Sequence, residues 1–151
     1  MLYLASDHAA FGLKGELEKE LDAMGVKYDD LGVHGGGRKA DYPEFVGKAA
    51  SKVSANPKSD RAIVMCGTGM GACIAANKYP HVRAALIYND GTAALAREHN
   101  DANIACFGGR EQDGRDVKRW VRIFLQTPFS GDERHVRRIA QIEESERNAR
   151  R

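Results

Sequence analysis

Short apolar segments alternate with helical patterns along the whole chain, and this alternation constrains the fold more than any other feature of the sequence. Five segments are typical of buried strands: residues 2–5, 26–31, 61–66, 82–88 and 103–107. Apolar residues at helical spacing predict helices at residues 11–24, 43–54, 72–77, 91–99, 117–125 and 135–146. Because such an alternation requires crossover connections, it predicts an α/β protein. We expect a three-layer α/β/α sandwich with a five-stranded, mostly parallel, Rossmann-like sheet and a C-terminal helix.

No linker and no shift in composition divides the chain, so we expect residues 1–151 to form a single domain. The glycine-rich segment 34–39 is too short to separate two domains and is expected to be a loop, and residues 147–151 are expected to be a frayed end. An apolar fraction of 42% and a charged fraction of 29% are typical of a globular protein with a real core. They exclude a disordered or collagen-like chain.

Charge and cysteine usage exclude several classes of partner. The formal net charge is +2, which gives no electrostatic reason to expect nucleic acid. The apolar segments fall well short of the roughly 20 residues of a membrane span, and Asp7 follows the first one too soon for a secretory signal. The three cysteines, Cys66, Cys73 and Cys106, lack the spacing of a disulfide framework or a zinc site. We therefore expect a cytoplasmic protein with no metal and with neither nucleic acid nor a membrane as its partner.

Ligands of open α/β sheets bind outside the carboxyl ends of the strands, so the residues at those positions are the first candidates for a site. The residues that end or follow the predicted strands are Asp7, His8, Cys66, the loop 67–71, Asn89, Asp90 and Arg110. His99 and Asn100 close the helix before the last predicted strand, and we expect the His99 side chain to reach the same cleft.

The loop Gly67-Thr68-Gly69-Met70-Gly71 is the sharpest local motif. It is not a Walker A loop, because no Gly-Lys-Ser/Thr follows. It matches a dinucleotide fingerprint through Gly67, Gly69 and Ala72, with Asp90 as the acid for a ribose. It also fits an anion-binding nest, in which backbone N–H groups converge at a helix start, and a glycine turn without a ligand remains a further interpretation.

Cys66 stands directly before this loop, where the start of a helix favours the thiolate form of a cysteine. A general base that faces an anion-stabilising loop would use this thiol, whereas a nucleotide fingerprint has no need of it. The alternative is that Cys66 is a small buried apolar residue. Cys73 and Cys106 are interpreted as packing residues.

The histidines and arginines allow a functional and a structural interpretation each. His99 is either a helix C-cap or an acid/base group, and His8 either binds a ligand or caps the next helix. Arg134, Arg137 and Arg138, with His135, open the last helix. They form either a solvated face or a phosphate clamp, and Arg110 could bind the same anion.

Taken together, these motifs identify a resemblance to the type B ribose-5-phosphate isomerases, a family that includes the galactose-6-phosphate isomerase subunits. The motifs that carry it are SDHAAFGLK (6–14), DYP (41–43), CGTGMG (66–71), IAANK (74–78), REHNDAN (97–103), FGGR (107–110) and RHxxR (134–138). The resemblance extends from the first predicted strand to about residue 142. Several long motifs in one order are far more specific than the glycine loop alone.

The resemblance implies an aldose–ketose isomerase that needs no metal or other cofactor and works as a homodimer or a dimer of dimers with shared active sites. It assigns to Cys66 the base that moves a proton between C1 and C2. Some relatives carry a glutamate at the position of Ala72, so this chain resembles the cysteine version. The resemblance makes His99 the acid that opens the sugar ring, and it places the Thr68 hydroxyl near the sugar oxygens.

The same resemblance implies a set of substrate-binding residues: Asp7, His8, Gly67, Thr68, Gly69, Met70, Gly71, Asn100, Arg110, Arg134 and Arg138. The loop amides would stabilise an enediolate, and the arginines would bind the phosphate, some of them from the partner subunit. We expect the substrate pair ribose 5-phosphate and ribulose 5-phosphate. A nucleotide-binding module built on Gly67, Gly69, Ala72 and Asp90 is the alternative, although one domain leaves no room for a second substrate and Cys66 would have no role.

Overall fold

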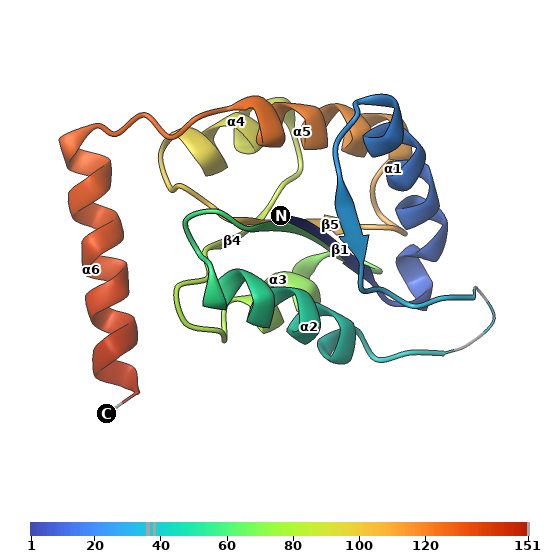
Figure 1. The fold of residues 1–151 in the computed structure, drawn as a ribbon, viewed down its shortest axis with the longest axis horizontal. Helices are drawn as coiled ribbons and strands as arrows, with labels where there is room; N and C mark the ends of the chain where they lie inside the picture. The colour runs from blue at the N-terminus through green and yellow to red at the C-terminus, as the bar shows by residue number, and fades with distance from the viewer. Residues whose placement is uncertain (36, 38, 151) are drawn as a thin grey trace.

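The computed structural model describes residues 1–35, 37 and 39–150 as a five-stranded sheet with helices on both faces (Figure 1). The strands are β1 (Leu2–Ser6), β2 (Tyr28–Asp30), β3 (Arg61–Cys66), β4 (Ala84–Leu86) and β5 (Ile104–Gly108). The helices are the 3₁₀ turn η1 (His8–Ala10), α1 (Phe11–Ala23), α2 (Tyr42–Ala55), α3 (Met70–Ala76), α4 (Asp90–Glu98), α5 (Gly114–Gln126) and α6 (Glu133–Ala149). The strand order is β2-β1-β3-β5-β4, and every pair is parallel. The predicted fold class is confirmed.

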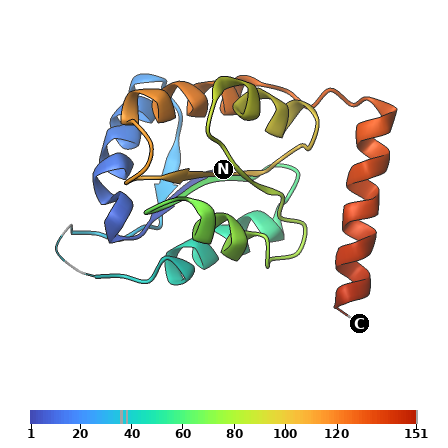
Figure 2. The same ribbon diagram turned by 180° about the vertical axis from the view of Figure 1, so that it is seen from behind.

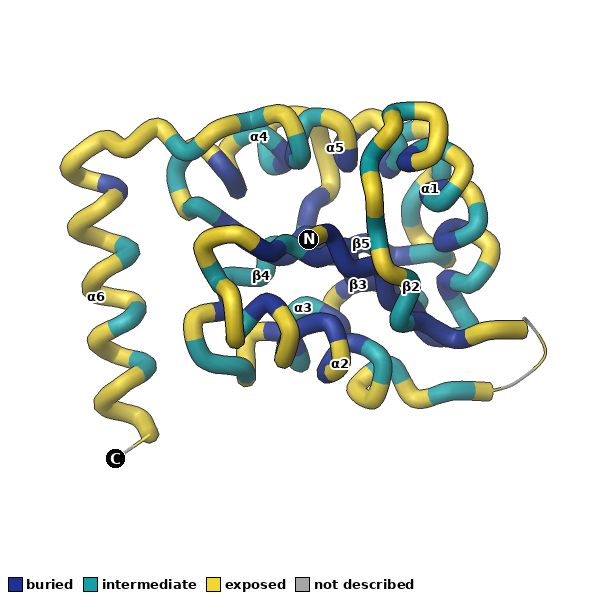
Figure 3. Tube along the Cα trace, in the orientation of Figure 1, coloured by how far each residue is buried: buried dark blue, intermediate teal, exposed yellow. Residues whose placement is uncertain are grey.

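Two apolar cores lie on the two faces of the sheet (Figure 1). Helices α1, α4 and α5 cover one face, and α2 and α3 cover the other. Side chains alternate along β3, so Met65 joins the core under α1 and α5, whereas Val64 and Cys66 join the core over α2 and α3. Figure 3 shows β3 buried after its first residue, as expected for a central strand covered on both faces. The thiol of Cys66 therefore belongs to the α2/α3 side of the sheet.

The observed elements differ from the predicted ones mainly at their ends. Strands β2 and β4 are shorter than predicted because each lies at an edge and pairs with one neighbour only. Helix α5 starts at Gly114, earlier than its first apolar residue, because the Asp113 side chain accepts a hydrogen bond from the Arg115 amide and caps it. Of the predicted loop 34–39, Gly36 and Arg38 lie outside the described residues.

Helix α6 stands beside the three layers, at the β4 side of the molecule (Figures 1 and 2). It continues beyond Glu146 to Ala149, and Arg150 donates a hydrogen bond to the carbonyl of Lys78. The prediction of a frayed end is therefore wrong for residues 147–149, which are helical; Arg151 lies outside the described residues. Two further polar contacts tie the helix to the body: Glu143 to Arg83, and Glu146 to the amide of His81.

The parallel sheet gives the molecule two distinct edges. Every strand ends at the carboxyl edge, where η1, the glycine loop and the segment after β5 follow β1, β3 and β5. The crossover helices bring the chain back to the amino edge, where the turn 99–103 leads into β5. Helix α6 begins near the end of α4, on the amino-edge side (Figures 1 and 2).

Candidate active site

Three loops meet at the centre of the carboxyl edge because β1, β3 and β5 are neighbours in the sheet. The amide of Gly109 donates to the carbonyl of Cys66 over 2.8 Å, and the amide of Arg110 donates to the carbonyl of Gly67 over 2.9 Å. The connection from β1 leads over one face of the sheet and the connection from β3 over the other, so the strand order reverses between them. This topological switch point is where ligands of doubly wound sheets bind.

Two glycines make the close approach of these loops possible. Gly69 has a φ of +79°, and a Cβ there would lie 2.8 Å from the carbonyl carbon of Phe107. A Cβ on Gly108 would lie 2.7 Å from the carbonyl carbon of Thr68. Both positions exclude a larger side chain for steric reasons, and Gly69 also requires a left-handed backbone. The glycine loop is therefore fixed against the end of β5.

Cys66 ends β3 with its side chain against the glycine loop. The residue is 4% exposed, and the amide of Gly69 donates a hydrogen bond to Sγ over 3.2 Å. A thiolate accepts such a bond more strongly than a neutral thiol does. The other two cysteines lie on the same face of the sheet, with Cys106 fully buried in β5 and Cys73 half-buried on α3.

Asp7 and His8 follow β1 at the same edge. The Asp7 carboxylate is buried, and Oδ1 accepts hydrogen bonds from the amides of Ala9 (2.9 Å) and Ala10 (3.3 Å). Asp7, and not His8, is therefore the cap of the turn that follows. The His8 imidazole is held through Nδ1, which lies 3.1 Å from the carbonyl oxygen of Ala40 and 3.2 Å from its amide nitrogen.

Arg110 completes the group at this edge. A Cβ on Gly67 would lie 3.6 Å from Cδ of Arg110 and 3.8 Å from the Cβ of Ala9, so the exposed arginine side chain lies across the start of the glycine loop. The structure thus brings together Asp7, His8, Cys66, the loop 67–71 and Arg110. We call this set the carboxyl-edge group.

His99 and Asn100 lie at the opposite edge, so the expectation that His99 reaches the cleft of its own chain is wrong. Helix α4 carries the chain back from the end of β4, and His99 is its C-cap. Strand β5 then runs from Ile104 to Gly108, which pairs with Cys66. At about 3.3 Å per residue this strand separates the two edges by about 13 Å, and His99 lies further out still.

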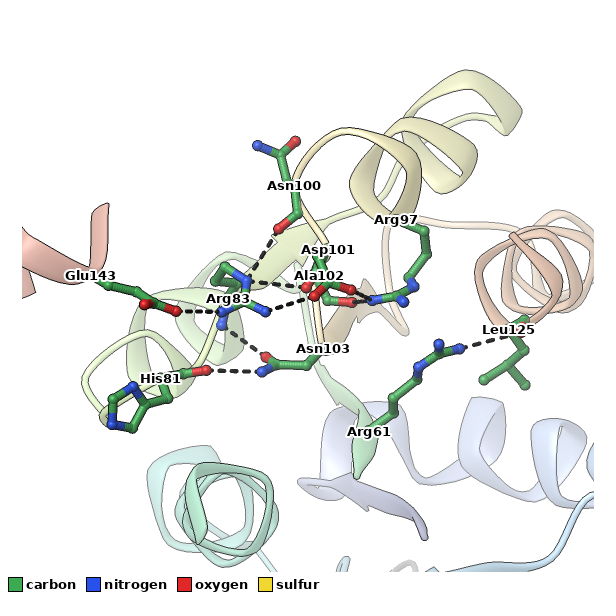
Figure 4. Close-up of polar contacts among 10 residues, drawn as sticks. All are labelled: Arg61, His81, Arg83, Arg97, Asn100, Asp101, Ala102, Asn103, Leu125 and Glu143. Carbon is green, nitrogen blue, oxygen red and sulfur yellow. Dashed lines mark hydrogen bonds and ion pairs between the residues drawn. The ribbon is translucent and has the colours of Figure 1, made fainter. Parts of the chain in front are cut away.

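Two arginines build the turn that carries His99 and Asn100 (Figure 4). Nε of Arg83 donates to the carbonyl oxygens of Asn100 and Asp101, both over 3.1 Å. The Asp101 carboxylate accepts from Arg83 (3.1 Å) and from the buried Arg97 (2.8 Å). Asp101 has a φ of +44°, which these bonds hold in place. Figure 4 shows the Asn100 side chain pointing away from the network.

The first turns of α6 add the remaining candidate residues at the amino edge. Arg134 and Arg138 are exposed on this helix, and Arg134 lies 3.8 Å from the carboxylate of Asp132. Between them His135 is buried, and its ring stacks on His99 with centroids 4.1 Å apart and an interplanar angle of 16°. We call His99, Asn100, Arg134 and Arg138 the amino-edge group.

Sequence reasoning missed the residues that hold the amino-edge group in place. Arg83 lies in none of the motifs, and Arg97 opens the motif 97–103 without a role expected of it, yet both are bonded to the turn below His99. His135 was grouped with the surrounding arginines as part of a basic cluster. The one available signal was its position between Arg134 and Arg138, which cannot reveal a partner on another helix.

The nucleotide-binding alternative finds no support in the geometry. Asp90 follows β4, which β5 separates from the strand before the glycine loop. Its Oδ1 already accepts hydrogen bonds from Nε of Arg119 (2.9 Å) and from Nε1 of Trp120 (2.7 Å). A ribose-binding acid needs a free carboxylate next to the glycine loop. Asp90 instead packs α4 against α5.

The described residues hold neither a cluster of metal ligands nor a helix that could span a membrane. In residues 1–35, 37 and 39–150, no three side chains of His, Cys, Asp or Glu are grouped as metal ligands. Over the same part of the chain, none of the helices has both the length and the apolar character that a membrane span requires.

The chain is similar to known sugar-phosphate isomerases over almost its whole length. A model of the family described as Ribose/Galactose Isomerase matches residues 2–142. The ribose-5-phosphate isomerase B of Mycobacterium tuberculosis is 41% identical, over 97% of this chain and 90% of that protein. The structure of ribose-5-phosphate isomerase B from Mycoplasma genitalium with bound ribulose-5-phosphate superposes with a TM-score of 0.92 at 39% identity, and the match covers 97% of this chain and 95% of that one. The Clostridium thermocellum enzyme gives a TM-score of 0.91 at 39% identity, with 98% of both chains covered.

Proposed function

The chain belongs to the ribose/galactose isomerase family, and from this membership we propose that it interconverts ribose 5-phosphate and ribulose 5-phosphate. The observation that carries the proposal is the Cys66 thiol at the end of β3, held against the glycine loop by the amide of Gly69. The relatives named ribose-5-phosphate isomerase B, one of them with bound ribulose-5-phosphate, support the choice of substrate.

The reaction moves a proton from C2, the carbon next to the aldehyde, to the aldehyde carbon C1, and it needs a base and an oxyanion stabiliser. In our proposal Cys66 removes the proton from C2 of the open-chain aldose and returns it to C1. The proton of the C2 hydroxyl passes to the C1 oxygen, so that C2 becomes the ketone carbon. Backbone N–H groups of residues 67–71 donate to the enediolate oxygens, and the Thr68 hydroxyl lies near the sugar oxygens. The steric fixation of Gly69 against β5 supports this role, because it fixes the loop, and fixed donors need no reorganisation when charge develops. The amide of Gly69 itself already donates to Sγ of Cys66, so the other loop amides would serve the sugar.

The rest of the carboxyl-edge group would hold the sugar. Asp7 and His8 are positioned by the bonds to Ala9 and Ala40 and would contact the hydroxyl groups. The exposed guanidinium of Arg110, which lies across Gly67, would bind the phosphate. No metal or other cofactor enters this mechanism.

We further propose that two copies of the chain share each active site, as a homodimer or a dimer of dimers. The separation of the two edges within one chain supports this arrangement, because His99 cannot reach the cleft next to its own Cys66. The amino-edge group of one copy would meet the carboxyl-edge group of its partner. His99 would then open the sugar ring as an acid, Asn100 would contact the sugar, and Arg134 and Arg138 would bind the phosphate.

The whole chain, residues 1–151, would act in this assembly as one domain. We place it in the cytoplasm, where the reducing environment would preserve the three free thiols.

Mixed oligomers test the shared site. Cys66→Ala and His99→Asn chains are each expected to be inactive alone, and they are co-refolded in equal amounts. The mixture should recover about a quarter of the wild-type activity, because about half of the dimers are mixed and each mixed dimer carries one intact site of two. No recovery, despite subunit exchange demonstrated by native mass spectrometry, would show that each chain completes its own site.

The substrate is tested directly with the wild-type chain. A coupled assay compares ribose, allose and galactose phosphates as substrates. We expect the highest kcat/KM with ribose 5-phosphate. A clear preference for a hexose phosphate would support the isomerase reaction but overturn ribose 5-phosphate as the substrate.

A further inference from the structure

The first turn of α6 contacts the body of the molecule through the stack of His135 on His99. His135 is 5% exposed, whereas its neighbours Arg134, Val136 and Arg138 are exposed. The segment before α6 is fixed at the same place, because the amide of Ser130 donates to the carbonyl of Glu98 over 3.0 Å. The end of α4 and the start of α6 are therefore joined through the two histidine rings.

His135 has the properties of a neutral spacer and lacks those of a hydrogen-bonding group. Among the described residues its buried Nε2 has no hydrogen-bond partner. Burial lowers the pKa of His135, and the neighbouring His99, Arg134 and Arg138 lower it further against the opposing effect of Asp132. These effects favour the uncharged form of the His135 ring, which suits a ring stacked on a second histidine. The two rings stack face to face, within 16° of parallel, so the contact covers a face of the His99 ring and not the edge that bears its nitrogens.

We infer that His135 is a positioning residue that joins His99 and the two phosphate-binding arginines into one rigid half-site. Its ring fixes the plane of His99, and its backbone sets the placement of Arg134 and Arg138 on the same helix. This inference rests on the proposed function. It adds to the proposed active site a residue that acts through the shape of its ring. The substrate need not contact His135 at all.

A pair of substitutions separates ring shape from ring chemistry. His135→Ala removes the stack and should lower kcat/KM for ribose 5-phosphate about 10- to 100-fold, through both a lower kcat and a higher KM, because the acid and the phosphate ligands lose their alignment. His135→Phe keeps a flat ring without the unpartnered nitrogen. It should stay within about threefold of the wild type and melt no lower. Val136→Ala, a truncation of the exposed next residue, is the matched control.

A second readout does not depend on activity. The stack should place the His99 ring signals of the wild-type chain upfield in NMR spectra through ring-current shifts, and His135→Ala should move these signals while Val136→Ala leaves them unchanged. If the wild type shows this shift but no isomerase activity, the proposed function fails and the stack remains. If His135→Phe loses as much activity as His135→Ala, or if His135→Ala keeps full activity, the positioning role is overturned.

Discussion

The two edges of the sheet are built in different ways. At the carboxyl edge, backbone groups do most of the work: Gly69 and Gly108 allow main chains to approach, and amides of Gly69 and Gly109 bond to Cys66. At the amino edge, charged side chains hold the structure together: Arg83 and Arg97 fix the turn below His99 through ion pairs and bonds to carbonyl oxygens. One edge is packed around a buried thiol, and the other presents exposed polar groups next to a helix that stands beside the body.

This difference matches the different roles of the two edges in the proposed mechanism. In the proposed mechanism, oxyanion stabilisation requires donors that do not move, and a strand end fixed by glycine packing would provide them next to the proposed base. Phosphate binding and ring opening require long or titratable side chains, which an exposed surface can offer to a second copy. Substitutions at the two edges should therefore have different effects. Those at the carboxyl edge should impair the proton transfer, and those at the amino edge should impair ring opening or substrate affinity.

Cys66→Ala should have the largest effect. Because it removes the proposed base and leaves the glycine loop in place, kcat should fall by at least about 10³-fold while the affinity for inorganic phosphate changes little. Steady-state assays and calorimetry with phosphate measure the two quantities. Retention of a tenth of the wild-type kcat would rule Cys66 out as the base.

Cys106→Ser is the matched control on the neighbouring strand. Cys106 is fully buried, and burial raises the pKa of its thiol well above the usual value, so it stays protonated. A hydroxyl in this apolar position should lower the free energy of unfolding by about 1–3 kcal/mol, with turnover largely retained. Denaturant unfolding and the isomerase assay distinguish the two effects.

His99→Asn should have the next largest effect, and only on one form of the substrate. Without an acid for ring opening, kcat for the cyclic sugar phosphate should fall about 10²- to 10⁴-fold, whereas an acyclic analogue should react nearly as before. Comparison of the two substrates provides the measurement. Equal losses on both would mean that His99 holds the amino edge together and does not open the ring.

Arg138→Ala should act on affinity. An arginine–phosphate bond is charge-assisted, so its loss should cost about 1.5–3 kcal/mol, equivalent to a 10- to 150-fold higher KM, with kcat less affected. Arg134→Ala should raise KM similarly. Arg137 is next to Arg138 on the same helix, and Arg137→Ala should have a milder effect. If Arg137→Ala raises KM as much as Arg138→Ala does, the phosphate is attracted by the overall positive charge of the helix and not by specific bonds to Arg138.

How much the sequence predicts differs between the two edges as well. The alternation of apolar segments predicts the layers, and the rule on strand ends leads directly to Asp7, Cys66 and Arg110. The sequence already places His99 before the last predicted strand, and the start of a parallel strand lies at the amino edge. The expectation failed because it let the side chain reach the cleft across the length of β5. The stack on His135 joins residues far apart in the chain, so only the tertiary structure reveals it.

The smallest effect on turnover is expected at Cys73, which lies on α3 on the same face of the sheet as Cys66. A hydrogen bond from Cys106 lowers the pKa of Cys73 to about 7, with a smaller contribution from Asn77, and burial opposes the shift. Its thiolate fraction therefore rises through pH 7, more than one unit below an unperturbed thiol. Alkylation of this half-buried thiol by iodoacetamide should follow the same curve, as measured by peptide mapping over a pH series.

Cys73→Ser separates a reactive thiol from the proposed catalytic one. The variant should lose the labelling that rises around pH 7, yet its kcat should stay within about threefold of the wild type, because Cys73 donates its S–H to the carbonyl of Ala84 and not to the glycine loop. A loss of turnover comparable to that of Cys66→Ala would remove the distinction between the two thiols. Such a loss would mean that Cys73 on α3 also takes part in catalysis, and that Cys66 is not the only residue responsible for the base.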